Sequence, residues 1–554
     1  MHFPLSIYIH LNFLFLAVIK KQFMPIRMTD DPTDPNQQND NGGGGRRGPN
    51  FPGGGGGLGA LLPMILGLLK GRGIIILLVI AVGAYFLIGK GGCNVSELSK
   101  LATGGFLDPK QFEKAKIYEP LADDPNRPPL PESANLQKFA PSVGNQGEQG
   151  SCVAWSSAYA ARTILESART AEQGEGLKFS PAFLYNQIGL DGCQGSYIIK
   201  AMEFMTQQGA VPYNDFQYDD QDCSRQPNQQ LMSDARQYRM HGFNRLSDGD
   251  RNDAIDLHAI KENLSQGAPV VIGMMVGQSF MKSMLGKDVW DPEDGDENMM
   301  GFGGHAMCVV GYDDKKYGGS FLLMNSWGSE WGENGFAWVR YNDFKYYVRE
   351  AYGLDPMAKV GAAANVPFTC EIGLVQVEYS GNKTITGDYI NLRSTGGNHF
   401  ETVSPVSMGS KFKMEVKNST ECYIYVFGKE TDGTCYTLFP YPTKEDATKT
   451  RYSPYCGITG YRLFPKDKSM TPDSIGIRDA MAVVVSKEEL DWYPINQQIS
   501  RNPKMDFTAR VNDAFGSKLS KTVRFKTTGN GTIQFNASND IRTIVACIVE
   551  IDKR

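Results

Sequence analysis

The stretch Asn145–Trp155 reads NQGEQGSCVAW and places Cys152 directly before a segment that favours a helix. Residues 153–169 are rich in Ala and contain neither Pro nor Gly, which predicts a helix that begins beside the cysteine. A thiol in the first turn of a helix lies at the positive end of the helix dipole, and this position favours the thiolate. We therefore expect Cys152 to be a reactive cysteine with a lowered pKa.

Two later segments supply the partners that a nucleophilic cysteine needs. His305 lies in the sequence GGHA before a strand-like apolar run, and Asn325 lies in the sequence NSWG after another such run. A histidine that takes the thiol proton, and an asparagine that orients the histidine ring, are the usual partners in acyl transfer by a thiol. The order Cys152, His305, Asn325 predicts this chemistry.

These motifs resemble those of the papain-like (cathepsin-type) cysteine peptidases, over roughly residues 128–355. The resemblance implies an α+β catalytic domain with a helical half and a β-barrel-like half. It gives Cys152, His305 and Asn325 the catalytic roles. It also implies that the side chain of Gln146 and the backbone N–H of Cys152 stabilise the oxyanion.

The resemblance extends to the substrate cleft. Residues 192–195 read GCQG and match the family's GCxGG cleft wall, except that Ser196 replaces the last glycine, which leaves backbone pairing with a substrate open at this position. In the family a related pair of cysteines is bridged, but the sequence alone does not decide whether Cys193 bonds Cys223. The residues that we expect to contact substrate are Gly195, Ser196, Ala306 and Trp327.

The usual helical propeptide of this family is not visible in the sequence. Residues 91–127 read as a short polar linker, after which the chain already resembles a mature peptidase. We therefore expect no activation by removal of a large pro-domain. Masking of the active site by the C-terminal domain or by a partner stays open.

The N-terminal region has a different composition. We expect residues 1–57 to be a disordered, low-complexity region, because residues 37–57 are rich in Asn, Gly and Pro. The apolar stretch at residues 3–19 is either an extra membrane segment or a part that is not translated, since translation can begin at Met1, Met24 or Met28.

Residues 58–90 are expected to anchor the chain in a membrane. The segment at about residues 73–89 is apolar and close to the ~17–25 residues that a spanning helix needs. Lys and Arg are more frequent before this segment than after it. This bias favours a single pass with a cytoplasmic N-terminus and a peptidase domain in the periplasm or at the cell surface.

The composition changes again after the peptidase, and residues 366–554 are predicted to form a β-sandwich accessory domain. Residues 422–427, 481–486 and 544–550 read as strands, and a Gly-Asn-Gly turn at 529–531 joins two strands of a hairpin. Residues 409–492 also resemble an uncharacterised β domain that recurs beside bacterial peptidases and kinases and carries no catalytic residues. The matching stretches are 423–427, 438–440 and 482–486.

Composition supports two folded domains and excludes other classes of protein. The chain has 554 residues with 41% hydrophobic content, which is more than one domain needs, and its net charge of −5 favours no particular partner. The sequence has no basic stripe with interleaved aromatics that would bind nucleic acid, no cluster of metal ligands, and no sign of a cofactor site.

We therefore expect a membrane-anchored cysteine endopeptidase, with its catalytic domain at residues 128–360, that cleaves peptide or protein substrates through a thioester acyl-enzyme. Two alternatives stay open. The same acyl-enzyme can pass to an amine, which would make the chain a transpeptidase. A catalytically silent papain-fold protein would instead act as an adhesion or scaffold protein through its β domain, whose ligand the sequence does not reveal.

Overall fold

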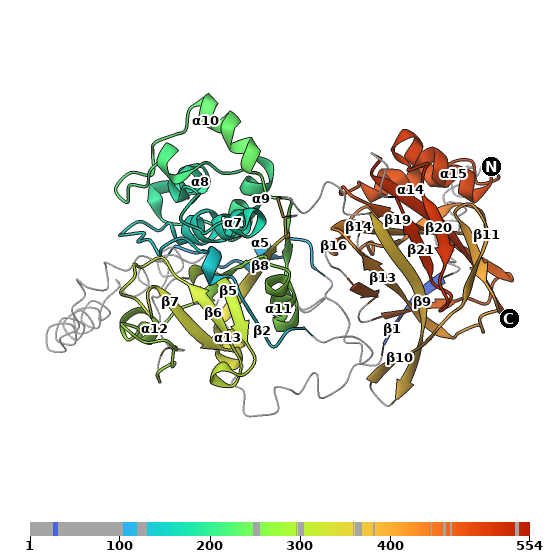
Figure 1. The fold of residues 1–554 in the computed structure, drawn as a ribbon, viewed down its shortest axis with the longest axis horizontal. Helices are drawn as coiled ribbons and strands as arrows, with labels where there is room; N and C mark the ends of the chain where they lie inside the picture. The colour runs from blue at the N-terminus through green and yellow to red at the C-terminus, as the bar shows by residue number, and fades with distance from the viewer. Residues whose placement is uncertain are drawn as a thin grey trace, which may run out of the picture.

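The computed structural model describes residues 26–31, 104–118, 130–247, 255–294, 296, 304–357, 359–360, 368–380, 383–444, 446–457, 461–465, 468–537 and 542–554. Figure 1 shows these residues as two domains, one mixed and one rich in strands. None of the described helices is long and apolar enough to cross a membrane. The predicted span at about residues 73–89 and the apolar stretch at 3–19 lie outside the described residues.

The helical half of the first domain is built around one buried helix, which confirms the helix predicted at residues 153–169. It runs in three consecutive pieces, of which the middle one is π-helical: α6 (Cys152–Ala154), η3 (Trp155–Arg162) and α7 (Thr163–Thr170). Because its side chains include many Ala and Ser residues, α8 (Pro181–Ile188) and α9 (Ile198–Gln207) pack directly against it.

The remaining helical segments of this domain are short, and several start at a capping side chain. Ser180 caps α8 by accepting the N–H of Phe183 at 2.9 Å, with Pro181 in the first turn, and Asp256 caps α11 in the same way. These segments are α5 (Pro109–Phe112), η2 (Gln137–Phe139), η4 (Asp191–Cys193), η5 (Tyr213–Asp215), α10 (Gln229–Asp234), η6 (Ala235–Tyr238), α11 (Leu257–Ser265), α12 (Gln278–Lys282), η8 (Lys316–Gly318) and α13 (Tyr341–Tyr347).

The other half of this domain is a seven-stranded sheet with the order β3-β8-β4-β5-β6-β7, with β2 added on β5. The strands β4, β5 and β6 are buried almost throughout, which explains their continuous apolar sequences. The bounds are β2 (Ser133–Asn135), β3 (Phe243–Arg245), β4 (Val270–Met275), β5 (Gly304–Asp313), β6 (Ser320–Met324), β7 (Phe336–Arg340) and β8 (Val348–Leu354). In Figure 1, α7, α8, α9 and α10 lie above the sheet, whereas α11, α12 and α13 lie beside its strands.

The second domain contains two sheets with an apolar core between them, consistent with the predicted β domain. The first has the order β1-β18-β13-β9-β21-β20, with β10 on β9 and β17 on β13. Its strands are β1 (Ile26–Asp30), β9 (Thr369–Ser380), β10 (Lys383–Tyr389), β13 (Lys411–Asn418), β17 (Tyr461–Phe464), β18 (Lys468–Pro472), β20 (Arg524–Thr527) and β21 (Ile533–Asn536). The pair β20–β21 is the hairpin predicted around residues 529–531.

The second sheet of this domain has the order β11-β12-β22-β19-β14-β15, with β16 on β14. Its strands are β11 (Leu392–Gly396), β12 (His399–Thr402), β14 (Cys422–Lys429), β15 (Cys435–Phe439), β16 (Tyr455–Cys456), β19 (Arg478–Ser486) and β22 (Ile544–Asp552). Residues alternate along β14: Ile424 and Val426 enter the core between the sheets, whereas Tyr425 and Phe427 pack on the other face.

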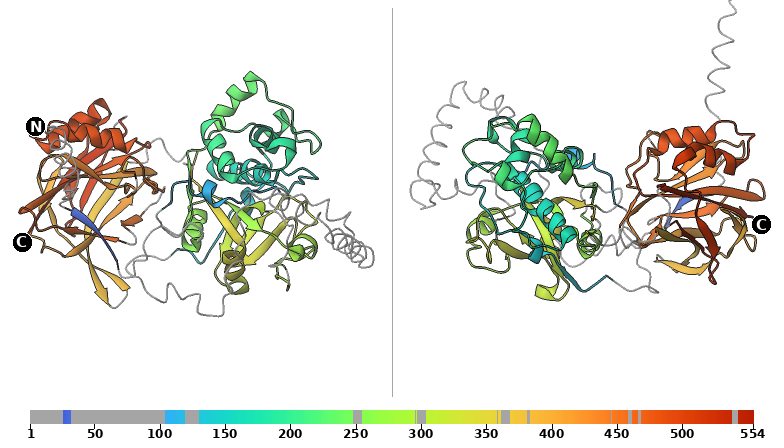
Figure 2. Two further views of the ribbon diagram at one scale, coloured as in Figure 1. Left: turned by 180° about the vertical axis from the view of Figure 1, so that it is seen from behind. Right: turned by 45° about the horizontal axis from the view of Figure 1, so that its top comes forward.

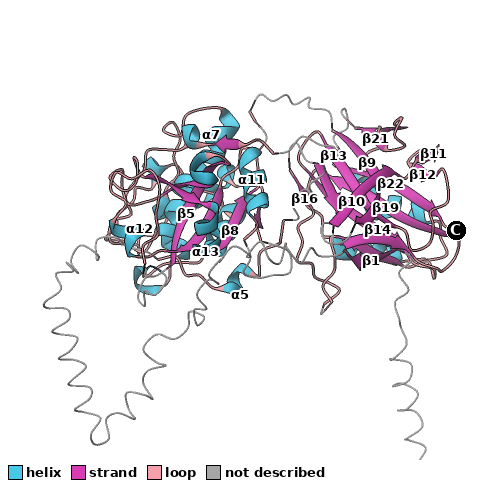
Figure 3. Ribbon diagram, turned by 90° about the horizontal axis from the view of Figure 1, so that it is seen from below, coloured by secondary structure: helices cyan, strands magenta, loops and turns pink. Residues whose placement is uncertain are grey.

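Two helices, α14 (Trp492–Ser500) and α15 (Phe507–Phe515), followed by the short η9 (Gly516–Lys518), cover this outer face. Figure 3 shows the strand-rich second domain beside the mixed first domain.

The strand β1 comes from the region 1–57 that composition predicts to be disordered, so that prediction is wrong for Ile26–Asp30. It pairs antiparallel with β18, and Figure 2 shows it, in blue, within the C-terminal domain. Ile26 is fully buried, and its N–H donates to the hydroxyl of Tyr436 at 3.0 Å. Directly after β1, the carboxylate of Asp31 pairs with the buried ammonium of Lys413 at 2.7 Å. Buried groups at both of its ends therefore hold this short strand.

A segment that we call the strap (residues 104–118) runs between the active site and the second domain. The residues predicted to be a linker, 91–127, thus include a segment with fixed contacts. At its end, Ile117 pairs in parallel with Arg245 of β3 on one side and with Tyr452 of the second domain on the other. Ile117 of the strap therefore forms a one-residue β-bridge to each of the two domains.

Candidate active site

Cys152 begins the central helix in the first domain, where the sequence places it. The preceding residue, Ser151, bonds the hydroxyl of Tyr218 at 2.6 Å, and that hydroxyl donates to the backbone carbonyl of Gln146 at 2.8 Å. These contacts fix the turn that enters the helix. The Cys152 sulfur accepts the backbone N–H of Ala306 at 3.4 Å, so the residue after His305 touches the thiol.

His305 and Asn325 come together because β5 and β6 are antiparallel neighbours. Cys308 lies opposite Met324, so His305, near the start of β5, faces Asn325 after the end of β6. The Nε2–H of His305 donates to Oδ1 of Asn325 at 2.7 Å. The neutral ring then carries its proton on Nε2, and Nδ1 is left as the basic nitrogen.

Trp327 packs on the face of the histidine ring. The two rings are stacked, with centroids 4.3 Å apart and planes inclined by 19°. Phe280 and Trp331 pack around Trp327 in turn. Trp327, predicted to contact substrate, is therefore placed to hold the His305 ring and to exclude water from its bond to Asn325.

Gln146 is fully buried beside Asn325. Its Nε2 donates to the carbonyl of Gln149 at 3.0 Å, and its Oε1 accepts the hydroxyl of Ser326 at 2.7 Å. An amide nitrogen has two hydrogens, and one remains for an oxyanion after the bond to Gln149. The predicted oxyanion role of Gln146 stays a prediction.

The strap covers the thiol. Gly105 donates its N–H to the carbonyl of Gly304 at 2.9 Å, and Phe106 donates to the carbonyl of Ser196 at 3.0 Å. The N–H of Ser196 donates in return to the carbonyl of Gly104 at 2.9 Å. Cys152 and His305 have no exposed surface under this cover. A substrate cannot reach the thiol until the strap moves.

Close approach of the strap depends on glycines on both sides. A Cβ on Gly104 would lie 2.2 Å from the carbonyl oxygen of Gly150, and a Cβ on Gly195 would lie 2.3 Å from the carbonyl oxygen of Gly104. Both glycines have φ near +139°, a conformation that other residues rarely adopt. Gly195 thus lies against the backbone of the strap, and its predicted contact with substrate stays a prediction.

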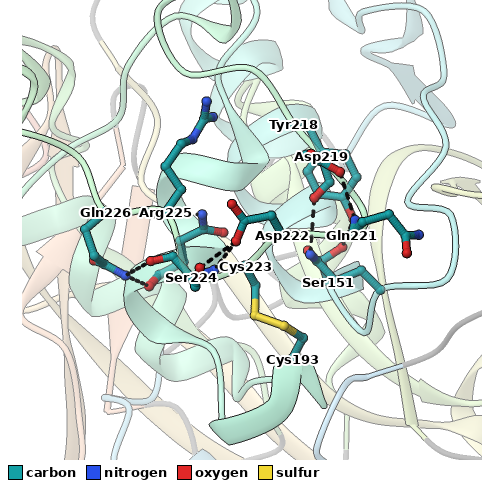
Figure 4. Close-up of a disulfide and its surroundings, with 12 residues drawn as sticks. Ser151, Cys193, Tyr218, Asp219, Gln221, Asp222, Cys223, Ser224, Arg225 and Gln226 are labelled. Atoms are coloured by element: carbon teal, nitrogen blue, oxygen red, sulfur yellow. Dashed lines mark hydrogen bonds between the residues drawn. A yellow bond between two sulfur atoms is a disulfide. The ribbon is translucent and has the colours of Figure 1, made fainter.

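Ser196 replaces a glycine of the family pattern without blocking this pairing. Its hydroxyl is buried and donates to the carbonyl of Ile188 at 3.0 Å, away from the strap, so its backbone stays available. The disulfide between Cys193 and Cys223 is present and ties this wall to the loop that contains Tyr218 (Figure 4).

Leu107 of the strap packs into the cleft next to residues that sequence analysis did not identify. A Cβ on Gly273 would lie 2.4 Å from Leu107 and 3.3 Å from Ile198, so the absence of a side chain at Gly273 makes room for Leu107. Beside them the buried carboxylate of Glu350 accepts the N–H of Asp108 at 3.1 Å and the hydroxyl of Tyr352 at 3.2 Å. Burial raises the pKa of Glu350 to about 8, so this carboxyl is largely protonated at neutral pH.

The thiol and the imidazole are both uncharged in the covered site. Burial raises the pKa of Cys152 to about 12, although the N–H groups of Ala306, Val153, Cys152 and Gly105 act in the opposite direction. Burial also lowers the pKa of His305 to about 4, opposed by the bond to Asn325. The expected lowered thiol pKa is therefore not found, because desolvation outweighs the helix start when the strap excludes water.

The strap backbone at Gly105 lies close to the thiol that it covers. The N–H of Gly105 is bonded to the carbonyl of Gly304 at 2.9 Å, and the N–H groups of Gly105 and Ala306 both act to lower the pKa of the Cys152 thiol. The strap thus pairs with Ser196 and Gly304 on both sides of the thiol.

Known proteins match this domain. Residues 130–354 match the papain family of cysteine proteases. Mouse cathepsin K is 28% identical over 257 residues, which are 46% of this chain and 71% of cathepsin K. An uncharacterised peptidase C1-like protein of Acanthamoeba polyphaga mimivirus is 29% identical over 219 residues, which are 38% of this chain and 67% of that protein.

A solved structure also matches. Xylellain, a cysteine protease from Xylella fastidiosa, is 25% identical, and the match covers 44% of this chain and 96% of xylellain with a TM-score of 0.35. The family match covers the helical half, the sheet, and the site that holds Cys152, His305 and Asn325. Residues 130–354 of this chain are a cysteine-type peptidase domain of the papain family.

Proposed function

We propose that this chain is a cysteine endopeptidase in which Cys152 is the nucleophile, His305 the general base and acid, and Asn325 the group that orients the histidine ring. The observation that carries this proposal is the 2.7 Å bond from His305 to Asn325 beside the thiol, because it leaves Nδ1 free to take the thiol proton. The same bond stabilises the imidazolium that forms.

Each step follows from these groups once the strap has left. Nδ1 of His305 takes the proton of Cys152, and the thiolate attacks the carbonyl carbon of the scissile peptide. The imidazolium then gives its proton to the leaving amine, which breaks the C–N bond and leaves a thioester. Water gives a proton to His305 and attacks the thioester, which releases the acid and restores the thiol.

Backbone groups at the cleft supply binding. The N–H of Cys152 and the free Nε2 hydrogen of Gln146 are proposed to stabilise the oxyanion. The backbones of Gly195 and Ser196 are proposed to pair with an extended substrate as they pair with the strap. Ala306 is proposed to contact substrate next to the sulfur that its N–H already touches.

We also propose that the enzyme works outside the cytoplasm, attached to a membrane through residues 58–90, with a β-sandwich accessory domain of unknown ligand. The Cys193–Cys223 disulfide supports an oxidising compartment. The apolar composition of residues 58–90 supports the attachment.

Labelling with an epoxysuccinyl thiol-protease inhibitor, followed by intact mass, tests the catalytic proposal on the full chain. We expect one adduct that is absent in Cys152→Ser and strongly slowed in His305→Ala, while the buried thiol of Cys308 stays unlabelled. Peptide products from a substrate library then establish hydrolysis, and products joined to an added amine would indicate transpeptidation instead. A folded protein that gains no adduct even with the strap displaced would be catalytically silent, and the proposal would be rejected.

A further inference from the structure

The strap is held at two places, and the two places lie in different parts of the molecule. Residues 104–107 occupy the cleft, and Lys116–Tyr118 lie between the two domains. On the peptidase side, Arg245 of β3 donates its N–H to the carbonyl of Lys116 at 2.7 Å and accepts the N–H of Tyr118 at 3.0 Å. These two bonds make the strap an added edge strand of the peptidase sheet.

The second domain binds the opposite edge of the same residues. Ile117 donates its N–H to the carbonyl of Arg451 at 2.6 Å, and its carbonyl accepts the N–H of Ser453 at 2.8 Å. The side chain of Ile117 is 1% exposed, and Lys116 pairs with the carboxylate of Glu489 on the second domain. Half of the backbone bonds at this end of the strap therefore come from the second domain.

A short rigid piece links the two ends. Asp108 caps α5 (Pro109–Phe112), and the N–H of Asp108 is bonded to Glu350. Phe112 is buried and packs edge-on against Tyr352, with ring centroids 5.2 Å apart. These contacts join the middle of the strap to β8 of the peptidase, between the two ends of the strap.

We infer that the C-terminal domain holds the strap in the cleft and so keeps the peptidase latent, and that moving this domain away from the peptidase releases the strap and uncovers Cys152. The inference rests on the proposed function, because latency has meaning only if the thiol is catalytic. It assigns the C-terminal domain a regulatory role: a partner that competes for its contact with Ile117 would activate the enzyme.

Ile117→Pro is the sharpest test, because proline lacks the N–H that bonds Arg451 but leaves both bonds between the strap and Arg245 in place. Ile117→Val, which keeps the N–H, is the matched control. The readouts on the full chain are amide hydrogen exchange in residues 104–107 and the rate of Cys152 labelling. Loss of one such bond is expected to speed both by roughly tenfold in Ile117→Pro, and by less than about twofold in Ile117→Val.

The ion pair gives a second, independent test. Glu489→Lys places two positive charges together and is expected to speed exchange and labelling a few-fold, and Lys116→Glu in the same chain is expected to reverse the effect. Lys315→Glu, in the exposed Lys315–Glu132 pair remote from the strap, is the control for charge reversal and is expected to change neither readout.

The possible failures are distinguishable. If exchange in residues 104–107 is unchanged in folded Ile117→Pro and Glu489→Lys, the C-terminal domain does not hold the strap and the inference is overturned. If exchange rises but no variant gains an adduct on Cys152, the thiol is not catalytic. In that case the proposed function falls, and the latency falls with it.

Discussion

Gly104→Ala should convert the covered active site into an open one without changing any group of the peptidase domain. The new Cβ would lie 2.2 Å from the carbonyl oxygen of Gly150, and the φ of +138° at this position is itself unfavourable for alanine. The clash involves backbone on both sides, so no side-chain rotation relieves it. The strap must leave the cleft or shift far enough to lose its bonds.

The size of the effect follows from the bonds that hold this end. Three backbone hydrogen bonds of 2.9 to 3.0 Å join Gly104, Gly105 and Phe106 to Ser196 and Gly304, and a longer fourth, from Gly104 at 3.4 Å, shares the carbonyl of Gly304 and is not counted here. At about 1 kcal/mol net for each bond, their loss shifts the equilibrium by about 3 kcal/mol, or roughly 100-fold. Cys152 in the Gly104→Ala variant should therefore react with an epoxysuccinyl inhibitor roughly 100 times faster than in the parent chain.

The assay is the second-order rate of adduct formation, measured by intact mass on the full chain. Gly267→Ala is the matched control, since Gly267 also has a positive φ but nothing within 4 Å of an added Cβ, so it carries the strain without the clash. Equal labelling rates in the parent and Gly104→Ala, with both proteins folded, would refute the reasoning that the strap covers the thiol.

Three further results are expected. The pKa of His305 is about 4 in the covered site, against an ordinary value of 6.5. Between these pH values the uncovered state therefore binds more protons than the covered state. The covered state is fully favoured above pH 6.5 and loses stability as the pH falls toward 4. Acidification from pH 6.5 to 5 should raise hydrogen exchange in residues 104–107, corrected for intrinsic rates, by up to about 15-fold, and unchanged protection would contradict this. Asn325→Ala should lower kcat by roughly 100-fold with little change in KM, because the His305 ring loses its hydrogen-bond acceptor. Steady-state kinetics on an activated form of the enzyme measure both constants. An equally large change in KM would contradict this prediction. Lys413→Ala should destabilise the second domain by about 3 kcal/mol, because it leaves the buried carboxylate of Asp31 without its opposite charge. A melting temperature no lower than that of the exposed control Lys315→Ala would count against this prediction.

The proposed catalytic residues could be identified from the sequence because each one lies in a local signature. Cys152 precedes an Ala-rich helix, and His305 and Asn325 flank buried strands whose apolar runs are visible in the sequence. The strap was not predictable in this way. Gly104-Gly105-Phe106 has no periodicity, and its function depends on contacts with Ser196 and Gly304, which are far away in sequence.

Two predictions were wrong because each depends on contacts between residues that are far apart in the sequence. The lowered pKa expected for Cys152 was wrong because the desolvation that raises it comes from non-local packing, including the strap. The strand Ile26–Asp30 was missed because five residues give a weak pattern, and the nearby residues 37–57 are rich in Asn, Gly and Pro. What identifies it as a strand is its partner β18, more than 400 residues later.

The pairing of β1 with β18 limits how this chain can meet a membrane. Two strands of one sheet lie on the same side of any bilayer, so the chain that leaves β1 at Asp31 and returns at Gly104 begins and ends in one compartment. The predicted single crossing at about residues 73–89 stays a prediction, and it would require β1 to leave its sheet. A tag inserted directly before Ile26 should therefore be reached by the same externally added protease as a tag after Arg554.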